Sequence, residues 1–293
     1  MISGDDTFTT TPSQSQVYMY RAQDSDAVWN DAGTLYAFRS DDPSNDEYGD
    51  ITPPETASGE FIPVPPAIAA GAQAGLESWS QANDVFNFIR IEDTAYDRND
   101  PNVIYLADSG LASPTVPNGR IWRMELDESD PTQVVELSVL IDGDALPLKD
   151  PGAIHQPDNL ETTANSLLIT EDPSSGNQFN LPTSDPYATS ARVWRYDLDT
   201  GTKEIVLKVD ESTDPSDGAS PMRLGNWEAS GVVDASTVFG EGYFFVTVQA
   251  HSLWVDQAPG LDLTGPGGVP NGVPDWTYKR EGGQLLLVHI PGA

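Results

Sequence analysis

The sequence predicts an all-β protein built from a repeated sheet unit. Its apolar residues alternate with polar ones along short segments rich in β-branched and aromatic residues, which is typical of strands. No long stretch follows the period of an amphipathic helix, and the 24 prolines and 25 glycines suit a chain with many turns. A similar set of segments occurs three times along the chain. Such repetition is typical of a solenoid or a β-propeller.

The middle copy of the unit is the clearest. Its three expected strands are, in order, residues 155–161 (HQPDNLE), 166–172 (SLLITED) and 191–201 (ARVWRYDLDTG). The first is a polar strand that carries Asp158 and Asn159. The second is apolar along its length, as expected of a buried strand, and ends in Glu171 and Asp172. The third alternates between apolar and polar residues and ends in a turn.

The same order of strands is expected on both sides of this copy. The corresponding segments are residues 91–97, 103–110 and 119–127 upstream, and residues 227–234, 242–251 and 283–290 downstream. The acids Glu92, Asp158 and Glu228 hold the same place in the three copies, 66 and 70 residues apart. This period is longer than the ~40–50 residues of common propeller repeats, so long loops are expected.

A single domain is expected over residues 1–293, with two long surface excursions. The first, residues 40–83, is acidic and rich in proline at its start, and residues 68–83 are its candidate for a short helix despite two glycines. The second, residues 255–280, is too rich in glycine for regular structure. Neither is expected to be a domain boundary, because strand patterns of the same character resume after each.

The charge and the composition exclude several classes of partner and of site. The chain has 46 acidic and 14 basic residues, a net charge of −32 that repels phosphate backbones, so nucleic-acid binding is not expected. Such a surface attracts divalent cations, and it also keeps a protein soluble in salt-rich water. No stretch approaches the ~18 apolar residues of a membrane span. The absence of cysteine excludes disulfides, thiolate metal ligands and thiol nucleophiles.

Five motifs, in this order, resemble those of the PhoX-type alkaline phosphatase family. They lie in residues 91–97, 157–173, 191–197, 228–236 and 248–251, and the resemblance covers roughly residues 15–290. It implies a β-propeller of about six blades in a secreted, periplasmic or cell-surface protein. It also implies a phosphomonoesterase site in the central channel that uses calcium together with iron.

The chain departs from this family in what it lacks. The family carries an Asn-His-Glu motif and, in well-known members, a cysteine that bridges iron, and this sequence has neither. It is similar to the carboxy-terminal half to two-thirds of such a protein. Three interpretations stay open: a fragment, a chain whose propeller is completed by another chain, and a homologue that has lost the reaction.

The repeat predicts a cluster of carboxylates on one axis. The first strand of each propeller unit lines the central channel, and the ends of the second strands lie near one mouth. Converging carboxylates repel one another and raise their pKa values unless a cation lies among them. Oxygen-rich ligand sets suit hard cations such as calcium or magnesium. The predicted metal ligands are Glu92, Asp93, Asp158, Glu171, Asp172 and Glu228.

Two further residues are candidates for catalysis. Asn159 is expected to hold a metal ligand or the substrate, and His251 to act as a ligand or as the acid that protonates the leaving group. Each predicted site residue also has a structural interpretation. The acids can cap turns at strand entries, and a histidine is more often hydrogen-bonded within the structure. The arginines of the outer strands are expected to be ion-paired surface groups; they are Arg120, Arg123, Arg192 and Arg195.

Three functions follow from these observations. The first is a metal-dependent hydrolase of small phosphate monoesters, or the metal-carrying part of one. The second is a non-catalytic calcium-binding protein of the extracellular space or the cell surface. The third is a calcium-dependent, lactonase-like hydrolase. A phosphatase also needs positive charge at its phosphate, which metals would supply in a chain with so few basic residues.

Overall fold

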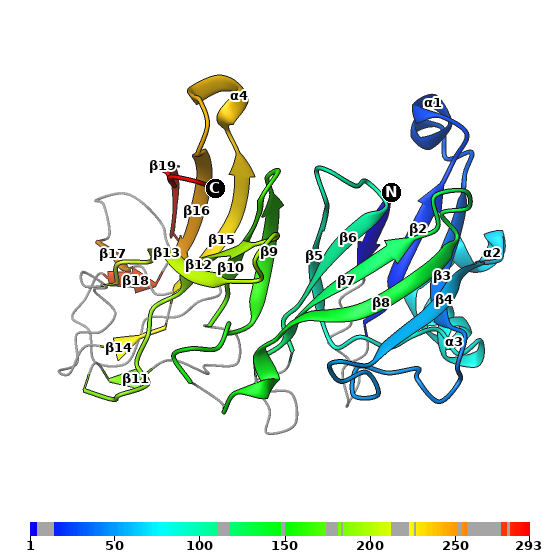
Figure 1. The fold of residues 1–293 in the computed structure, drawn as a ribbon, viewed down its shortest axis with the longest axis horizontal. Helices are drawn as coiled ribbons and strands as arrows, with labels where there is room; N and C mark the ends of the chain where they lie inside the picture. The colour runs from blue at the N-terminus through cyan, green and yellow to red at the C-terminus, as the bar shows by residue number, and fades with distance from the viewer. Residues whose placement is uncertain are drawn as a thin grey trace.

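The computed structural model describes eleven stretches of the chain. They are residues 1–4, 15–110, 118–147, 150–173, 181–182, 184–211, 223–225, 227–250, 254–256, 277–279 and 282–293. Antiparallel sheets make up most of them, and the few helices are short (Figure 1). The predicted all-β class is therefore confirmed.

The first eight strands form one sheet. In chain order they are β1 (Ile2–Gly4), β2 (Val17–Arg21), β3 (Thr34–Ser40), β4 (Thr56–Pro63), β5 (Ile91–Tyr96), β6 (Val103–Asp108), β7 (Arg120–Leu126) and β8 (Gln133–Asp142). Their order in the sheet is β1-β2-β3-β4-β8-β7-β6-β5. Because β1 and β5, at the two ends, also lie in contact, the sheet is nearly closed into a barrel. Separate propeller blades are not seen here, since β4 pairs directly with β8.

Two further sheets follow in the chain. One contains β9 (Pro157–Thr162), β10 (Ser166–Glu171), β12 (Arg192–Asp197) and β13 (Lys203–Lys208); the other contains β15 (Trp227–Asp234), β16 (Tyr243–Ala250) and β19 (Gly282–His289). Their orders are β9-β10-β12-β13 and β15-β16-β19. The strands of the three predicted units are thus confirmed within a few residues of their expected bounds.

The remaining elements are short. They are the strand pairs β11 (Leu181–Pro182) with β14 (Arg223–Leu224) and β17 (Trp254–Asp256) with β18 (Thr277–Lys279), the helices α1 (Ser25–Trp29), α2 (Pro66–Ala69), α3 (Gln73–Ala82) and α4 (Ser236–Phe239), and the 3₁₀ turn η1 (Gly143–Ala145).

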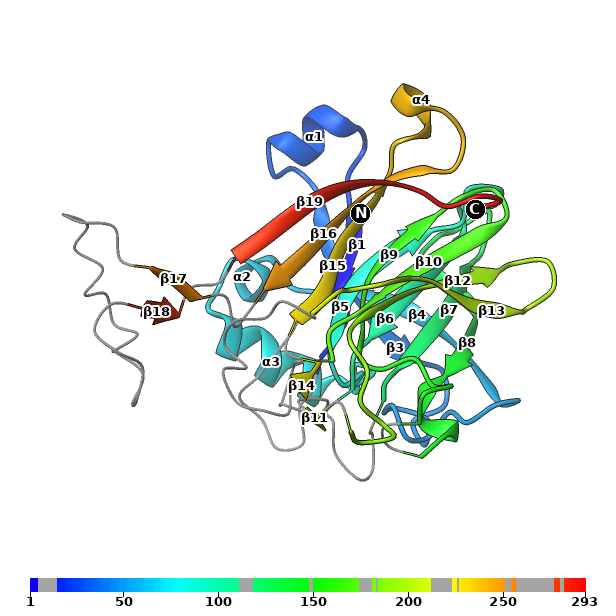
Figure 2. The same ribbon diagram turned by 90° about the vertical axis from the view of Figure 1, so that its left-hand side faces the viewer.

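Apolar side chains join these sheets into a stack. One buried cluster fills the barrel-like sheet, with Phe38, Phe86 and Trp122 among its members. A second cluster packs β6 and β7 against β9 and β10, and a third packs β10 and β12 against β15 and β16. Because the second and third clusters lie between neighbouring sheets, the three units stack one after another (Figures 1 and 2).

The first predicted excursion differs from the expectation. Residues 40–83 contain β4, which pairs with β3 and β8, and the buried side chains of Tyr48 and Ile51. The predicted helix is divided into α2 and α3, which cover the outer face of β2 and β3. The segment was expected at the surface because it is rich in prolines and acids. In the structure, its apolar residues enter the core. Most of the second excursion, residues 255–280, lies outside the described residues.

Candidate functional site

The sheet register shows that the first strands of the three units, here called the inner strands β5, β9 and β15, are equivalent. In each inner strand one residue pairs with the last residue of the neighbouring second strand; these pairs are Ile91–Asp108, Pro157–Glu171 and Trp227–Ala250. The residues that follow are Glu92, Asp158 and Glu228. Contacts place β9 between β5 and β15. The structure therefore brings three predicted ligands to the same position of three adjacent inner strands.

Each inner strand is also irregular near its acid. Glu92 is the extra residue between two paired residues of β5, and Asp158 lies in a similar shift of β9. In β15 the shift follows Ala229, and the Ser230 hydroxyl donates to Glu228 Oε1 at 2.6 Å. Bulges of this kind interrupt the alternation of side chains, so they can aim a polar group away from the sheet face.

The electrostatics of Asp158 show that these acids interact. Burial, and after it the negative charges of Glu228, Glu92 and Asp172, together raise the pKa of Asp158 to about 8, against the opposing effect of Arg90. In the structure as it stands, the Asp158 carboxyl is therefore mostly protonated at pH 7. Four acids, Glu92, Asp158, Asp172 and Glu228, make up what we call the acidic cluster.

Arg90 is a basic group in contact with the acidic cluster. Its guanidinium forms an ion pair with Glu92, and it lies 3.9 Å from Asp172. The chain is held there by Asp108, whose buried carboxylate accepts the backbone N–H groups of Ile89 and Arg90 at 3.0 and 2.9 Å. Sequence reasoning missed Arg90. Its position two residues before Glu92, at the entry to an inner strand, is the signal that could have found it.

Glu171 does not join the acidic cluster. Its side chain is fully buried, and Arg192 donates from Nε to Oε2 and from Nη2 to Oε1, each at 2.7 Å. The His155 backbone and the Trp194 indole also donate to Oε1, both at 2.8 Å. Because protein donors occupy both oxygens, these contacts favour a structural role for Glu171 over the predicted role of metal ligand.

The outer-strand arginines divide into two kinds. Arg123 and Arg195 form ion pairs with exposed or half-exposed glutamates, as predicted. Arg120 and Arg192 were also expected at the surface, but their side chains are 6% and 1% exposed. The guanidinium of each packs on the face of an aromatic ring. Its central carbon lies 4.2 Å from the Tyr48 ring centroid in Arg120 and 4.6 Å from the Trp194 ring centroid in Arg192. Both residues begin strands, and their charges face acids inside the molecule.

Asp93 and Asn159 bind to each other and to the backbone. Asp93 Oδ2 accepts the Leu160 N–H of the neighbouring inner strand at 2.8 Å, and Oδ1 accepts the Thr94 N–H at 2.7 Å. The Asn159 side chain is a further donor to Asp93, whose pKa is raised by burial. These contacts join β5 to β9, so they favour the structural interpretation of both residues over the ligand and catalytic ones.

Two findings concern the predicted metal centre. His251, the predicted acid catalyst, lies outside the described residues. Within the described part of the chain, no three His, Asp or Glu side chains stand close enough together to hold a metal ion. The acidic cluster thus has the oxygen donors that a hard cation prefers, without a complete set of ligands in place.

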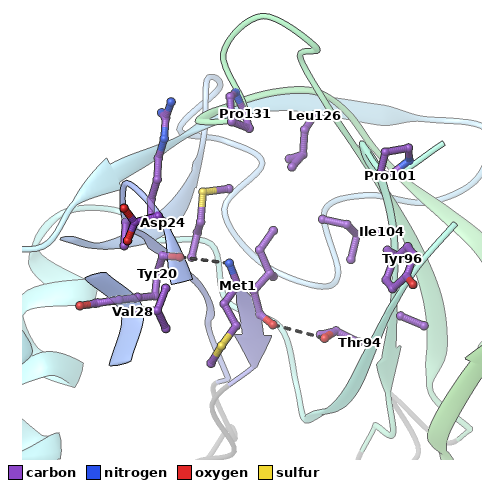
Figure 3. Close-up of a pocket in the computed structure, with 15 residues that line it drawn as sticks. Met1, Tyr20, Asp24, Val28, Thr94, Tyr96, Pro101, Ile104, Leu126 and Pro131 are labelled. Carbon is purple, nitrogen blue, oxygen red and sulfur yellow. Dashed lines mark hydrogen bonds between the residues drawn. The ribbon is translucent and has the colours of Figure 1, made fainter. Parts of the chain in front are cut away.

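A pocket lies at the other end of β5 from Glu92. It has a volume of about 510 Å³, and Met19, Ile104, Leu126 and Tyr96 are among its lining residues (Figure 3). Thr94 donates to the Ile2 carbonyl at 3.4 Å inside it. None of the predicted site residues lines this pocket, so the acidic cluster and this pocket are separate features.

Comparison with known proteins found no matching family model, no matching curated protein and no matching solved structure. The described residues contain no helix that is both long and apolar enough to span a membrane.

Proposed function

We propose that the protein is a metal-dependent phosphomonoester hydrolase of the PhoX-like type, or the metal-carrying part of one. The acidic cluster would hold calcium, with iron as the second metal that the resemblance implies. The observation that supports this most is that Glu92, Asp158 and Glu228 occupy equivalent positions of three adjacent inner strands. They are close enough that Glu92 and Glu228 raise the pKa of Asp158. The proposed location is the periplasm, the cell surface or the extracellular medium.

The chemistry of the acidic cluster suits a hard cation. Repulsion among carboxylates is relieved either by a proton, as on Asp158, or by a metal ion. Binding of calcium would therefore displace that proton. Bound calcium would supply a positive charge that polarises a phosphate ester and activates water.

Arg90 would take part in binding the phosphate group. A guanidinium binds phosphate oxygens through paired N–H donors, and this one lies at the edge of the acidic cluster. Its ion pairs with Glu92 and Asp172 hold it in place. Arg90 would thus provide the positive charge that a phosphatase needs and that the arginines of the outer strands do not offer.

The test combines metal content with turnover. Elemental analysis of the purified protein should find calcium, and p-nitrophenyl phosphate should be hydrolysed without a chelator and not with one. Glu228→Gln should weaken calcium binding by about 10- to 100-fold or more, as loss of a ligand or its supporting contact does. Glu241→Gln is the matched control, since Glu241 is exposed and lies near the other end of the same sheet. A protein that binds no calcium would contradict the proposal.

A second candidate is a calcium-binding protein without catalysis. It is favoured by the incomplete ligand set of the described residues and by the absence of the Asn-His-Glu motif. Calcium binding that depends on Glu228, with no turnover of phosphate esters, would support it. Turnover of a lactone alone would instead support the lactonase-like hydrolase.

A further inference from the structure

A buried carboxylate lies behind the entry to each of the three inner strands. In each unit it accepts the backbone N–H of a residue just before the strand, at distances between 2.8 and 3.1 Å. The pairs of acceptor and donor are Asp108 with Ile89, Glu171 with His155, and Glu211 with Gly225. All three acids are at most 1% exposed. The same contact thus occurs at three separate places in the fold.

The three donors hold the same place relative to the acidic cluster. Each lies three residues before a cluster acid of its inner strand, and these acids are Glu92, Asp158 and Glu228. Three residues of extended chain leave the acid little freedom once the first of them is fixed. Each buried carboxylate therefore helps to determine where a cluster acid lies.

The third carboxylate comes from a different part of the chain. In the first two units it belongs to the last residue of the second strand, Asp108 of β6 and Glu171 of β10. The last residue of β16 is Ala250, which has no carboxylate, and Glu211, which follows β13, accepts the N–H instead. Burial of a charge is costly unless it has partners. Its recurrence from another segment indicates that the contact itself is retained in all three units.

The acidic cluster needs such contacts because its members repel one another. Glu92 and Glu228 raise the pKa of Asp158, so the three negative charges interact across neighbouring inner strands. Repulsion of this kind pushes the strand entries apart. A hydrogen bond to a carboxylate is roughly twice as strong as one between neutral groups, so it opposes this movement at each entry.

We propose that Glu211 is a positioning residue of the acidic cluster. Through the Gly225 N–H it holds the entry to β15, so that Glu228 stays close to the acids of the other two inner strands. The affinity of the cluster for calcium then depends on a side chain that is not one of its members. This consequence for calcium rests on the proposed function, whereas the position of Glu228 does not.

Asp108 and Glu171 have the same role in their own units. Each also accepts the indole N–H of a buried tryptophan, Trp122 for Asp108 and Trp194 for Glu171. A substitution at either acid would also disturb the packing of that tryptophan. The test is therefore made at Glu211.

Two variants of Glu211 separate its role as an acceptor from its charge. Glu211→Met keeps an unbranched side chain without an acceptor oxygen, and Glu211→Gln keeps an oxygen that can accept the Gly225 N–H. In calcium titrations, Glu211→Met should bind about 10- to 100-fold more weakly, as expected when a contact that orients a ligand is lost. Glu211→Gln should bind like the wild type. In crystal structures, Glu228 should lie about 1 Å or more farther from Asp158 in Glu211→Met than in the wild type.

The control is Ile290→Ala, which removes a buried side chain from the apolar cluster beside the same sheet. It should lower the melting temperature and leave both the calcium affinity and the position of Glu228 unchanged. Glu211→Asp keeps the charge and draws the oxygens back by one methylene group. It takes the place of Glu211→Met if that variant does not fold, and it should show a smaller loss in the same direction.

The outcomes distinguish this proposal from the proposed function. Glu228 in the same position in the wild type and in Glu211→Met would overturn the role of Glu211, whether or not calcium binds. A wild type that binds no calcium would contradict the proposed function alone, and the crystal structures would then decide about Glu211. Equal losses of calcium affinity in Glu211→Met and Glu211→Gln, or in Glu211→Met and Ile290→Ala, would also overturn the positioning role.

Discussion

Asp158, at the beginning of β9, and Glu171, at the end of β10, lie on paired strands but have very different surroundings. Glu171 is fully buried, yet five hydrogen bonds from Arg192, His155 and Trp194 stabilise its negative charge. Asp158 is surrounded mainly by other acids, and its pKa is raised to about 8. Burial alone does not distinguish a structural acid from a candidate ligand. The distinction lies in whether the neighbours are donors or further carboxylates.

The raised pKa of Asp158 gives a prediction for the pH dependence of stability. The folded pKa of about 8 exceeds the unfolded value near ~3.9, so the folded state binds the proton more tightly. This contribution to stability is complete below the unfolded pKa, and it is lost as the pH rises toward 8. Asp158→Asn has no such titration. We expect it to be more stable than the wild type by about 2–5 kcal/mol at pH 9 and similar at pH 4.

Urea unfolding of both proteins at the two pH values, with a chelator present, measures this difference. Glu241→Gln should follow the wild type at both pH values, since Glu241 is exposed. The same pH dependence in Asp158→Asn and the wild type would show that the acids do not interact as described.

At the scale of elements, the first sheet depends on contacts that are distant in the chain. Trp122 of β7 is fully buried, and its ring lies 5.6 Å from Tyr48, 6.1 Å from Phe86 and 5.5 Å from Phe88. Its indole N–H lies 3.4 Å from Asp108, the acid that holds Arg90 in place. One aromatic residue thus links β7, the segment before β4 and the entry to the inner strand β5.

Removal of this ring should destabilise the whole sheet. Trp122→Ala is expected to cost about 3–5 kcal/mol of unfolding free energy, the usual range for a large aromatic residue in a core. Trp29→Ala is the matched control: its side chain is 88% exposed, and surface changes stay within about 0.5 kcal/mol. Denaturant unfolding of the three proteins compares the two losses. Equal stability of the two variants would contradict the packing described here.

The strands of the three units could be predicted because alternation and turn residues are local properties of the sequence. The equivalence of Glu92, Asp158 and Glu228 could be predicted for the same reason, since it follows from spacing within a repeat. The pairing of β4 with β8 could not, because it joins segments about 75 residues apart through backbone groups that any sequence possesses. The burial of Arg192 opposite Glu171 depends likewise on which residues face one another across two strands.

At the scale of the whole molecule, the charge of −32 affects every comparison of stability. Self-repulsion destabilises a compact state, and any salt reduces this effect by screening. Calcium should therefore stabilise the protein in two ways: by screening, which sodium chloride also provides, and by binding to the acidic cluster, which it does not. The two contributions can be separated at equal ionic strength.

At equal ionic strength, we expect calcium to raise the melting temperature above its value in sodium chloride. A ligand at 100 times its dissociation constant adds about 2.7 kcal/mol, which is about 4–8 °C for a chain of this size. In Glu228→Gln this extra rise should disappear while the effect of sodium chloride remains, because the variant loses one charge of the cluster and little of the total. Glu241→Gln removes the same charge from an exposed position and should keep the full response. Equal melting temperatures in the two salts would show that calcium acts on the surface charge as a whole, and the acidic cluster would then not be a calcium site.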